Sequence, residues 1–260
     1  MQFVEIFLLG LCVGSFLNVL VDRLPREESV IQGRSYCESC KKELRWYDLI
    51  PLFSYISLKG KCRYCRISLS IYYPLVEFVT GIVFVSMVIL TMDNFQLNQI
   101  ITLAYNLFIA SSLIVIFFTD LKYGIIPDKI IFPSIAISII YLFLNPQLSA
   151  LPILSALGAF LFFLLLFLGT RGRGMGFGDV KLAIFMGIIL GFPNIIVALY
   201  LAFLTGAIVG VIIILWKKER LKGATMPFGP FLVFGTFLAL VFGNYILEKT
   251  SPLLYPLLHP

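Results

Sequence analysis

Two aspartates lie where long apolar runs meet short polar segments. Asp120 comes at the end of one run, and Asp179 directly follows the glycine-rich stretch 174–178. An unpaired carboxylate beside hydrocarbon is costly, so an acid at the edge of a membrane helix is by default a candidate functional group. A helix C-terminus favours cations, so helix stability does not account for Asp120. Asp179 also has a structural explanation, because an acid after a turn can serve as the N-cap of the next helix.

Together, the two acids could perform hydrolysis. Carboxylates that share a site do not both ionise readily, so one is expected to hold a proton while the other acts as a base, and the sequence does not say which. A water between them can attack a carbonyl as the base takes its proton and the acid donates to the carbonyl oxygen. An extended peptide could lie along the open backbone of Gly176 and Gly178, with Lys181 nearby.

Composition places the chain in a bilayer. Of its 260 residues, 60% are hydrophobic and 13% are charged. The apolar runs are unbroken rather than alternating, which favours helices over a membrane barrel. We therefore expect an all-α polytopic bundle of about eight transmembrane helices. The predicted spans are 3–21, 72–92, 97–119, 126–144, 151–169, 180–191, 193–216 and 228–247.

The distribution of basic residues predicts the orientation. With these spans, 19 of the 20 Lys and Arg residues fall on one side, and only Lys249 falls on the other. Cytoplasmic loops are enriched in basic residues, so the N-terminus is expected outside and both aspartates at the cytoplasmic face. Topology thus explains the net charge of +6, and nucleic-acid binding is not needed. The run 3–21 lacks the basic start of a cleavable signal peptide.

The first long loop carries a metal-ligand pattern. Cys37 and Cys40 form one CxxC pair, Cys62 and Cys65 form another, and 21 residues separate the pairs. Four thiolates give the closed tetrahedral site of structural zinc. Two disulfides are the competing interpretation, but they do not persist in a reducing cytoplasm. We expect three parts: a first span, a zinc-ribbon-like cytoplasmic loop domain and a larger membrane domain. Their expected boundaries are 1–21, 22–71 and 72–260.

Further polar residues sit near the predicted cytoplasmic ends of spans. Glu77 could pair with Asn18, Lys181 or a loop arginine, or could bind a cationic substrate group. Asp128 follows a proline and is expected to be an N-cap. The segment 227–230, with two prolines and a glycine, is expected to border the same site as the aspartates.

These motifs together resemble the type IV prepilin peptidases over nearly the whole chain. The matching elements, in order, are Gly14-Ser15-Phe16-Leu17-Asn18, Arg23-Leu24-Pro25, the two CxxC pairs, Tyr73-Pro74-Leu75-Val76-Glu77, Asp120, Ile126-Pro127-Asp128, Gly176-Phe177-Gly178-Asp179-Val180-Lys181-Leu182 and Pro227-Phe228-Gly229-Pro230.

The resemblance implies an aspartic endopeptidase of the GxGD class in the bacterial cytoplasmic membrane. Its catalytic residues would be Asp120 and Asp179. Its substrates would be type IV prepilins or pseudopilins, whose short basic leaders the family cleaves after a glycine. Many members also methylate the new N-terminus with S-adenosylmethionine, and the cysteine-bearing loop is characteristic of those bifunctional forms. Glu77 and Asn18 are the only candidates here for contact with the methyl donor.

Two other functions remain as alternatives. A secondary transporter could use paired acids to bind a coupling ion, although transporter sites usually lie near the midplane between internal repeats. A zinc-stabilised methyltransferase without protease activity would keep its function when Asp179 is replaced by Asn.

Overall fold

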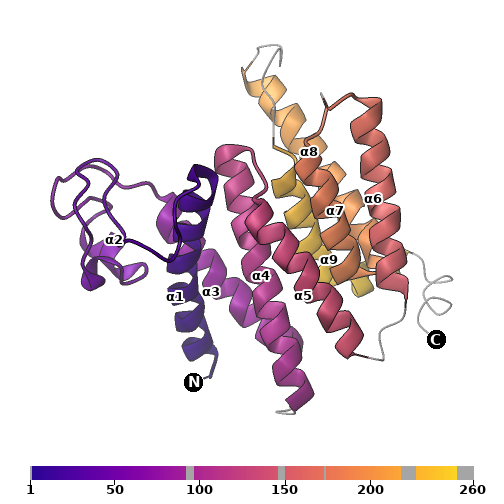
Figure 1. The fold of residues 1–260 in the computed structure, drawn as a ribbon, viewed down its shortest axis with the longest axis horizontal. Helices are drawn as coiled ribbons and strands as arrows, with labels where there is room; N and C mark the ends of the chain where they lie inside the picture. The colour runs from indigo at the N-terminus through magenta and orange to yellow at the C-terminus, as the bar shows by residue number, and fades with distance from the viewer. Residues whose placement is uncertain (1, 92–96, 146–149, 173, 218–226, 251–260) are drawn as a thin grey trace. The chain divides into compact units, whose positions relative to one another are not determined.

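The computed structural model describes residues 2–91, 97–145, 150–172, 174–217 and 227–250, which form helices joined by turns (Figure 1). Within these ranges no strand forms, and the only extended pairings are two isolated bridges, Tyr36 with Glu43 and Lys61 with Ser68. The predicted all-α fold class is therefore confirmed. The chain divides into two compact units, Met1–Phe118 and Thr119–Pro260, and the division falls inside a single helix.

Each of the eight predicted spans coincides with a helix. Their bounds are α1 Gln2–Arg23, α3 Tyr72–Thr91, α4 Leu97–Tyr123, α5 Asp128–Leu144, α6 Leu151–Gly169, α7 Phe177–Leu190, α8 Asn194–Lys217 and α9 Gly229–Thr250. Six of these are long and apolar enough to cross a membrane. The other two, α5 and α7, have 17 and 14 residues and are shorter than the roughly 20 residues of a full span.

In the first unit, α1 and α3 pack against each other in opposite directions. The close approach depends on glycine, because a Cβ on Gly10 would lie 2.7 Å from the Cα of Gly81. A Cβ on Gly14 would lie equally close to the Cα of Glu77. The small residues of α1 thus serve helix packing, as membrane helix pairs commonly require.

The loop between α1 and α3 contains η1 (Leu24–Arg26), η2 (Trp46–Asp48) and α2 (Phe53–Ser57). Its first part is held by Arg23, whose guanidinium is buried at the end of α1. This group donates hydrogen bonds to the carbonyl oxygens of Ser29, Gln32 and Arg34 at 2.8, 3.2 and 3.0 Å. A single side chain therefore fixes the path of the chain as it leaves the helix.

In the second unit, α7 lies among α5, α6, α8 and α9. Eight of its 14 residues are buried. A Cβ on Gly187 would collide with the backbone of Ala156, so α6 and α7 touch closely at that level. Gly235 allows the same approach between α9 and Ala198 of α8. The short helix α7 is thus the packed centre of this unit.

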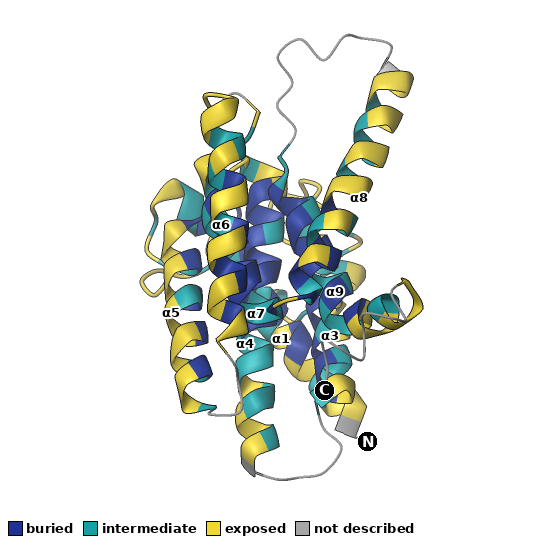
Figure 2. Cartoon of the chain, turned by 90° about the vertical axis from the view of Figure 1, so that its right-hand side faces the viewer, coloured by how far each residue is buried: buried dark blue, intermediate teal, exposed yellow. Residues whose placement is uncertain are grey.

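The outer helices of this unit carry exposed apolar residues (Figure 2). On α6 the spacing is three or four residues, which places these side chains on one helix face. They are Leu154, Leu157, Leu161, Leu165 and Leu168. A continuous exposed leucine stripe is what a lipid-facing helix surface requires, so α6 has the character of a membrane span.

Candidate active site and metal cluster

Asp179 lies in the first turn of α7, at its third residue. Gly176 is the N-cap, and its N–H donates to Oδ2 of Asp179 at 3.2 Å. The prediction that Asp179 itself is the N-cap was wrong, because α7 begins at Phe177 and not at Val180. The carboxylate instead folds back over the turn from the third position, as an acid does in a capping box. Gly178 packs against Ile126, where a Cβ would lie 3.2 Å from the nearest side-chain atom.

Asp120 lies in the last turn of α4 and faces the beginning of α9. A Cβ built on Gly229, the first residue of α9, would lie 2.5 Å from Oδ2 of Asp120. The Gly229 N–H is directed at the same carboxyl group, yet Oδ2 itself has no hydrogen-bond partner among the described residues. The segment 227–230 therefore does border Asp120.

The two carboxyl groups belong to the same unit and are close enough to interact electrostatically. Asp120 is 5% exposed and Asp179 is 6% exposed. Neither forms an ion pair with a cation in the part of the chain that the structure describes. Two buried acids without a counterion cannot both ionise at low cost, so this pair meets the requirement for one proton donor and one base.

Lys181 does not contact either aspartate through a salt bridge. Its Nζ lies 2.6 Å from Oδ1 of Asp128 and is positioned over the rings of Phe132 and Phe177. The prediction that Asp128 is an N-cap was wrong: Pro127 holds that position, and the Asp128 side chain bonds Lys181 rather than the helix backbone. The pair joins the beginning of α5 to α7.

Glu77 and Asn18 lie in the first unit. Oε2 of Glu77 accepts a hydrogen bond from the Leu52 N–H at 2.9 Å, and the Ser15 hydroxyl is a second hydrogen-bond donor to this carboxylate. The hydrogen-bond partner of Glu77 is thus a backbone N–H of the loop. The partners expected from the sequence were Asn18, Lys181 or a loop arginine. Asn18 is buried and donates to the carbonyl oxygen of Tyr73 at 3.1 Å, while its Oδ1 has no partner among the described residues.

The four loop cysteines come together. The sulfur atoms of Cys37, Cys40, Cys62 and Cys65 all lie within 4.8 Å of one another, and those of Cys37 and Cys65 are 3.8 Å apart. A tetrahedral zinc ion with bonds of about 2.3 Å separates its sulfur ligands by about 3.8 Å. The cluster therefore fits a structural zinc ion, with four ligands and no free position.

Two equivalent knuckles present these cysteines. Cys37 N–H donates to the carbonyl oxygen of Lys42 at 3.0 Å, and Cys62 N–H donates to that of Ile67 at 2.9 Å. Lys41 and Arg66, which follow the second cysteine of each pair, both have positive φ. The hydrogen bond and the residue of positive φ in the first knuckle are thus repeated 25 positions later in the second. This repetition is typical of a metal site built from two like turns.

Asp48 joins η2 to the second knuckle, a role that the sequence analysis missed. Its side chain is 3% exposed and accepts hydrogen bonds from Arg63 Nε at 2.6 Å, the Tyr64 hydroxyl at 3.1 Å and the Arg45 N–H at 3.1 Å. Burial raises the pKa of the Asp48 carboxyl group, but these hydrogen bonds outweigh burial and leave the pKa below its ordinary value. One signal was available, since Asp48 is the only acid between Glu43 and Glu77 in a basic loop.

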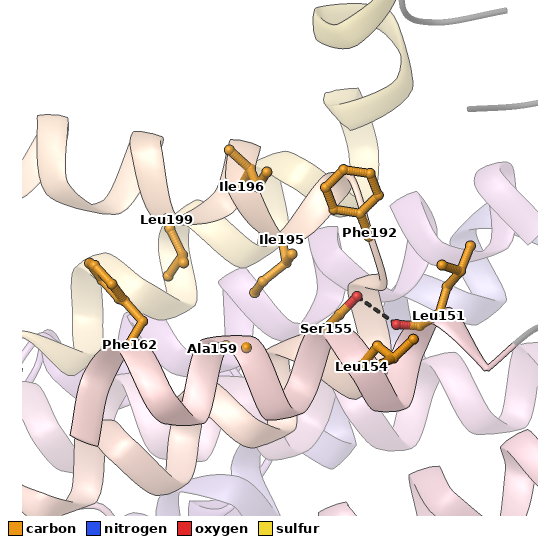
Figure 3. A pocket seen from close by; sticks show the side chains of 10 residues that line it. Leu151, Leu154, Ser155, Ala159, Phe162, Phe192, Ile195, Ile196 and Leu199 are labelled. Atoms are coloured by element: carbon orange, nitrogen blue, oxygen red, sulfur yellow. Dashed lines mark hydrogen bonds between the residues drawn. The ribbon is translucent and has the colours of Figure 1, made fainter. Parts of the chain in front are cut away.

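A cavity of about 310 Å³ in the second unit does not contain these acids (Figure 3). Apolar side chains such as Phe162, Phe192 and Leu199 line it, and the Ser155 hydroxyl is bonded to the carbonyl oxygen of Leu151 at 2.7 Å. Phe192 follows the C-terminal end of α7, about 20 Å along the helix from its first turn. The cavity is therefore apart from Asp120 and Asp179.

Comparison with known proteins decides the family. Residues 8–91 match the bacterial Peptidase A24 N-terminal domain, and residues 107–211 match the type IV leader peptidase family. The chain is 32% identical to a prepilin leader peptidase/N-methyltransferase of Bacillus subtilis, with 94% of this chain and 95% of the relative covered. The chain belongs to the type IV leader peptidase family. The predicted family is confirmed.

Two further relatives carry the same name. The Pseudomonas aeruginosa protein is 31% identical over 92% of this chain and 90% of its own. The Myxococcus xanthus protein is 33% identical over 82% of this chain, which spans only 63% of that relative's length. No solved structure matches the chain. Of the two matched regions, the leader peptidase region contains both aspartates and the N-terminal region contains all four loop cysteines.

The contact between Gly229 and Asp120 gives a prediction for this member of the leader peptidase family. We expect Gly229→Ala to lower the rate of leader cleavage by about 10²-fold, because the new methyl group would displace the Asp120 carboxylate by an ångström or so. The rate is measured on purified protein with a leader-bearing prepilin. Gly210→Ala is the matched control, since a Cβ there meets open space. Equal rates for Gly229→Ala and the unaltered protein would contradict the contact.

Proposed function

We propose that this chain removes the leader from type IV prepilins or pseudopilins and then methylates the new N-terminal amine. Membership of a family whose relatives are named prepilin leader peptidase/N-methyltransferase supports both reactions. The observation that carries the peptidase assignment is that two buried carboxyl groups, Asp120 and Asp179, interact electrostatically and form no ion pair with a cation among the described residues.

In the proposed mechanism, a water molecule lies between the two carboxyl groups. The ionised aspartate accepts a proton from the water while the water oxygen attacks the scissile carbonyl carbon. The protonated aspartate donates its proton to the carbonyl oxygen. The tetrahedral intermediate collapses when the first aspartate passes its proton to the amide nitrogen and the second aspartate takes a proton from a hydroxyl of the intermediate. The C–N bond then breaks, the carboxylic acid and the amine are released, and both aspartates are back in their starting protonation states without a covalent enzyme intermediate.

The glycine turn is proposed to hold the substrate in an extended form. Gly174 and Gly176 are exposed immediately before α7, and Gly176 has extended backbone angles. An extended peptide can hydrogen-bond along such a backbone, whereas a helical one keeps its carbonyl groups occupied. Gly178 and Lys181 are included in the proposed substrate site, with Lys181 held in place by Asp128.

Zinc and S-adenosylmethionine are the proposed cofactors. Zinc would be held by the four loop cysteines and would stabilise the loop without taking part in the reaction. S-adenosylmethionine would supply a methyl group to the free amine of the cleaved pilin. Glu77 and Asn18 are proposed to face the cationic groups of S-adenosylmethionine. Asn18 Oδ1 supports this, because it is a buried acceptor with no hydrogen-bond partner among the described residues.

We further propose that the protein spans the bacterial cytoplasmic membrane with its N-terminus outside. The basic loops and both aspartates would then face the cytoplasm, where the basic leader of a prepilin remains. The first span, the zinc loop and the peptidase region, residues 1–21, 22–71 and 72–260, are retained as proposed functional divisions.

A two-product assay tests this function. Purified protein is mixed with a leader-bearing prepilin and S-adenosylmethionine, and leader loss and methyl transfer are measured separately. We expect both products, with methylation only on cleaved pilin. Methyl transfer without leader loss would favour the methyltransferase alternative. Neither product, from protein with intact zinc, would reject the proposed function.

A further inference from the structure

The zinc loop exposes large apolar side chains around α2. Trp46, Phe53 and Ile56 are 75%, 66% and 71% exposed. Ile50 is exposed between them, so the apolar positions recur every three or four residues. The aromatic ring of Tyr55, by contrast, lies against Gly60, and its hydroxyl donates to the Leu69 carbonyl oxygen. The exposed residues are therefore not the ones that pack the knuckles.

A hydrogen bond ties the segment around α2 to the beginning of α3. The Leu52 N–H, at the N-cap of α2, donates to Glu77, which is the sixth residue of α3. Since α3 is one of the helices able to cross a bilayer, Leu52 lies beside the first two turns of a span. Figure 1 shows α2 at the left, to the side of α1 and α3, within the loop that connects them. In a bilayer crossed by α3, the segment would be level with the first two turns of that span.

The charge of the loop is concentrated in the same region. Residues 22–48 carry six basic and six acidic side chains. Residues 49–71 carry four basic side chains and no acidic one. These four are Lys59, Lys61, Arg63 and Arg66, of which Arg63 is paired with Asp48. Exposed aromatic and aliphatic side chains beside a positively charged stretch match an anionic lipid surface, which attracts basic residues near it.

We propose that residues 46–56, the α2 anchor, insert Trp46, Phe53 and Ile56 among the lipid headgroups of the cytoplasmic leaflet. The zinc loop would then lie on the membrane surface and not project into the cytoplasm. Trp is the side chain that membrane interfaces favour most clearly, because its ring is amphipathic. This inference goes beyond the proposed reactions and rests only on the proposed cytoplasmic location of the loop.

Tryptophan fluorescence tests the α2 anchor directly. The chain has two tryptophans, so Trp216→Phe leaves Trp46 as the only one. The full-length Trp216→Phe protein is placed in lipid nanodiscs without substrate. We expect Trp46 to be quenched by lipids brominated in the upper acyl chain and protected from iodide in the buffer. Iodide quenching as strong as for a free tryptophan, with no effect of the brominated lipids, would overturn the proposal.

Two variants test whether quenching of Trp46 depends on the α2 anchor or on any exposed apolar residue of the loop. Phe53→Asp combined with Ile56→Asp is expected to remove most of the brominated-lipid quenching of Trp46 while the zinc content stays unchanged. Ile31→Asp is the matched control, because Ile31 is 96% exposed in the same loop but outside the α2 anchor. If Ile31→Asp removes the quenching as fully as the double variant, the anchor is not residues 46–56.

Lipid charge and substrate provide the last comparison. Quenching is expected to be stronger in nanodiscs that contain phosphatidylglycerol than in those of phosphatidylcholine alone, and to weaken with salt. If Trp46 becomes protected only when a prepilin is added, the surface binds substrate and the membrane proposal is rejected. Leader cleavage measured on the same samples shows whether the proposed function holds independently.

Discussion

Asp120→Asn and Asp179→Asn are each expected to lower the rate of leader cleavage by about 10³-fold or more. A positioned acid or base contributes about 10²- to 10⁴-fold to such a reaction, and an amide can serve as neither. The two losses should not add, because both residues act on the same water and the remaining carboxyl group has no partner. The measurement is single-turnover cleavage of a prepilin by purified protein.

Two controls separate catalysis from folding. Zinc content and helix content should match the unaltered protein in both variants, since the cysteine cluster belongs to the other unit. Glu248→Gln is the matched control: it removes an exposed acid of the same unit, near the end of α9 and about 28 Å along that helix from Gly229. A surface substitution away from both aspartates changes little, so we expect nearly full activity. Substantial cleavage by either Asp120→Asn or Asp179→Asn would reject the paired-acid mechanism.

The helices were predictable because their apolar runs are long and unbroken. All eight runs are helical, and the bounds of α6 agree with the predicted 151–169. The start of α7 was placed three residues late, since glycines were taken to continue the turn. Gly178 is instead helical and packs against Ile126, a contact with a residue 52 positions away. Local preference for a turn is overridden there by close packing, which no local pattern reveals.

The partners of the polar residues were less predictable than the residues themselves. Asp120 and Asp179 stand out because acids are rare beside hydrocarbon, and the cysteines stand out by spacing. Which groups contact them depends on how helices distant in sequence meet. Gly229 reaches Asp120 because α9 begins beside the end of α4, and Leu52 reaches Glu77 because the loop folds back along α3. Such contacts follow from packing, not from local sequence.

The length of α7 also has a physical explanation. A helix of 14 residues spans about 21 Å and is too short to cross roughly 30 Å of hydrocarbon. It is enclosed by four helices, so its ends need not reach both membrane surfaces. Its N-terminus, with Asp179 and the glycine turn, can then lie below the membrane surface in contact with protein. A short, enclosed helix is a suitable carrier for a polar group that must act beside lipid.

Cys37→Ser is expected to lower the zinc affinity of the loop by more than about 100-fold. Loss of a residue that only supports a metal ligand costs about 10- to 100-fold in affinity, so loss of a ligand should cost more. The zinc-free loop should also become sensitive to protease, because metal binding supplies much of the folding free energy of such small sites. Zinc is measured after dialysis against a chelator, and cleavage within residues 24–71 is followed by mass spectrometry.

Cys12→Ser is the matched control for this prediction. Cys12 is the one cysteine of the sequence outside the two CxxC pairs. It lies in α1 and is exposed, so its replacement should leave zinc in place. Helix content should be unchanged in both variants, because the long helices do not depend on the metal. A protease-resistant loop in zinc-free Cys37→Ser protein would show that the hydrogen bonds of Asp48 and the two knuckles suffice without metal. Metal-free unaltered protein with four reduced loop thiols would exclude zinc from the cluster.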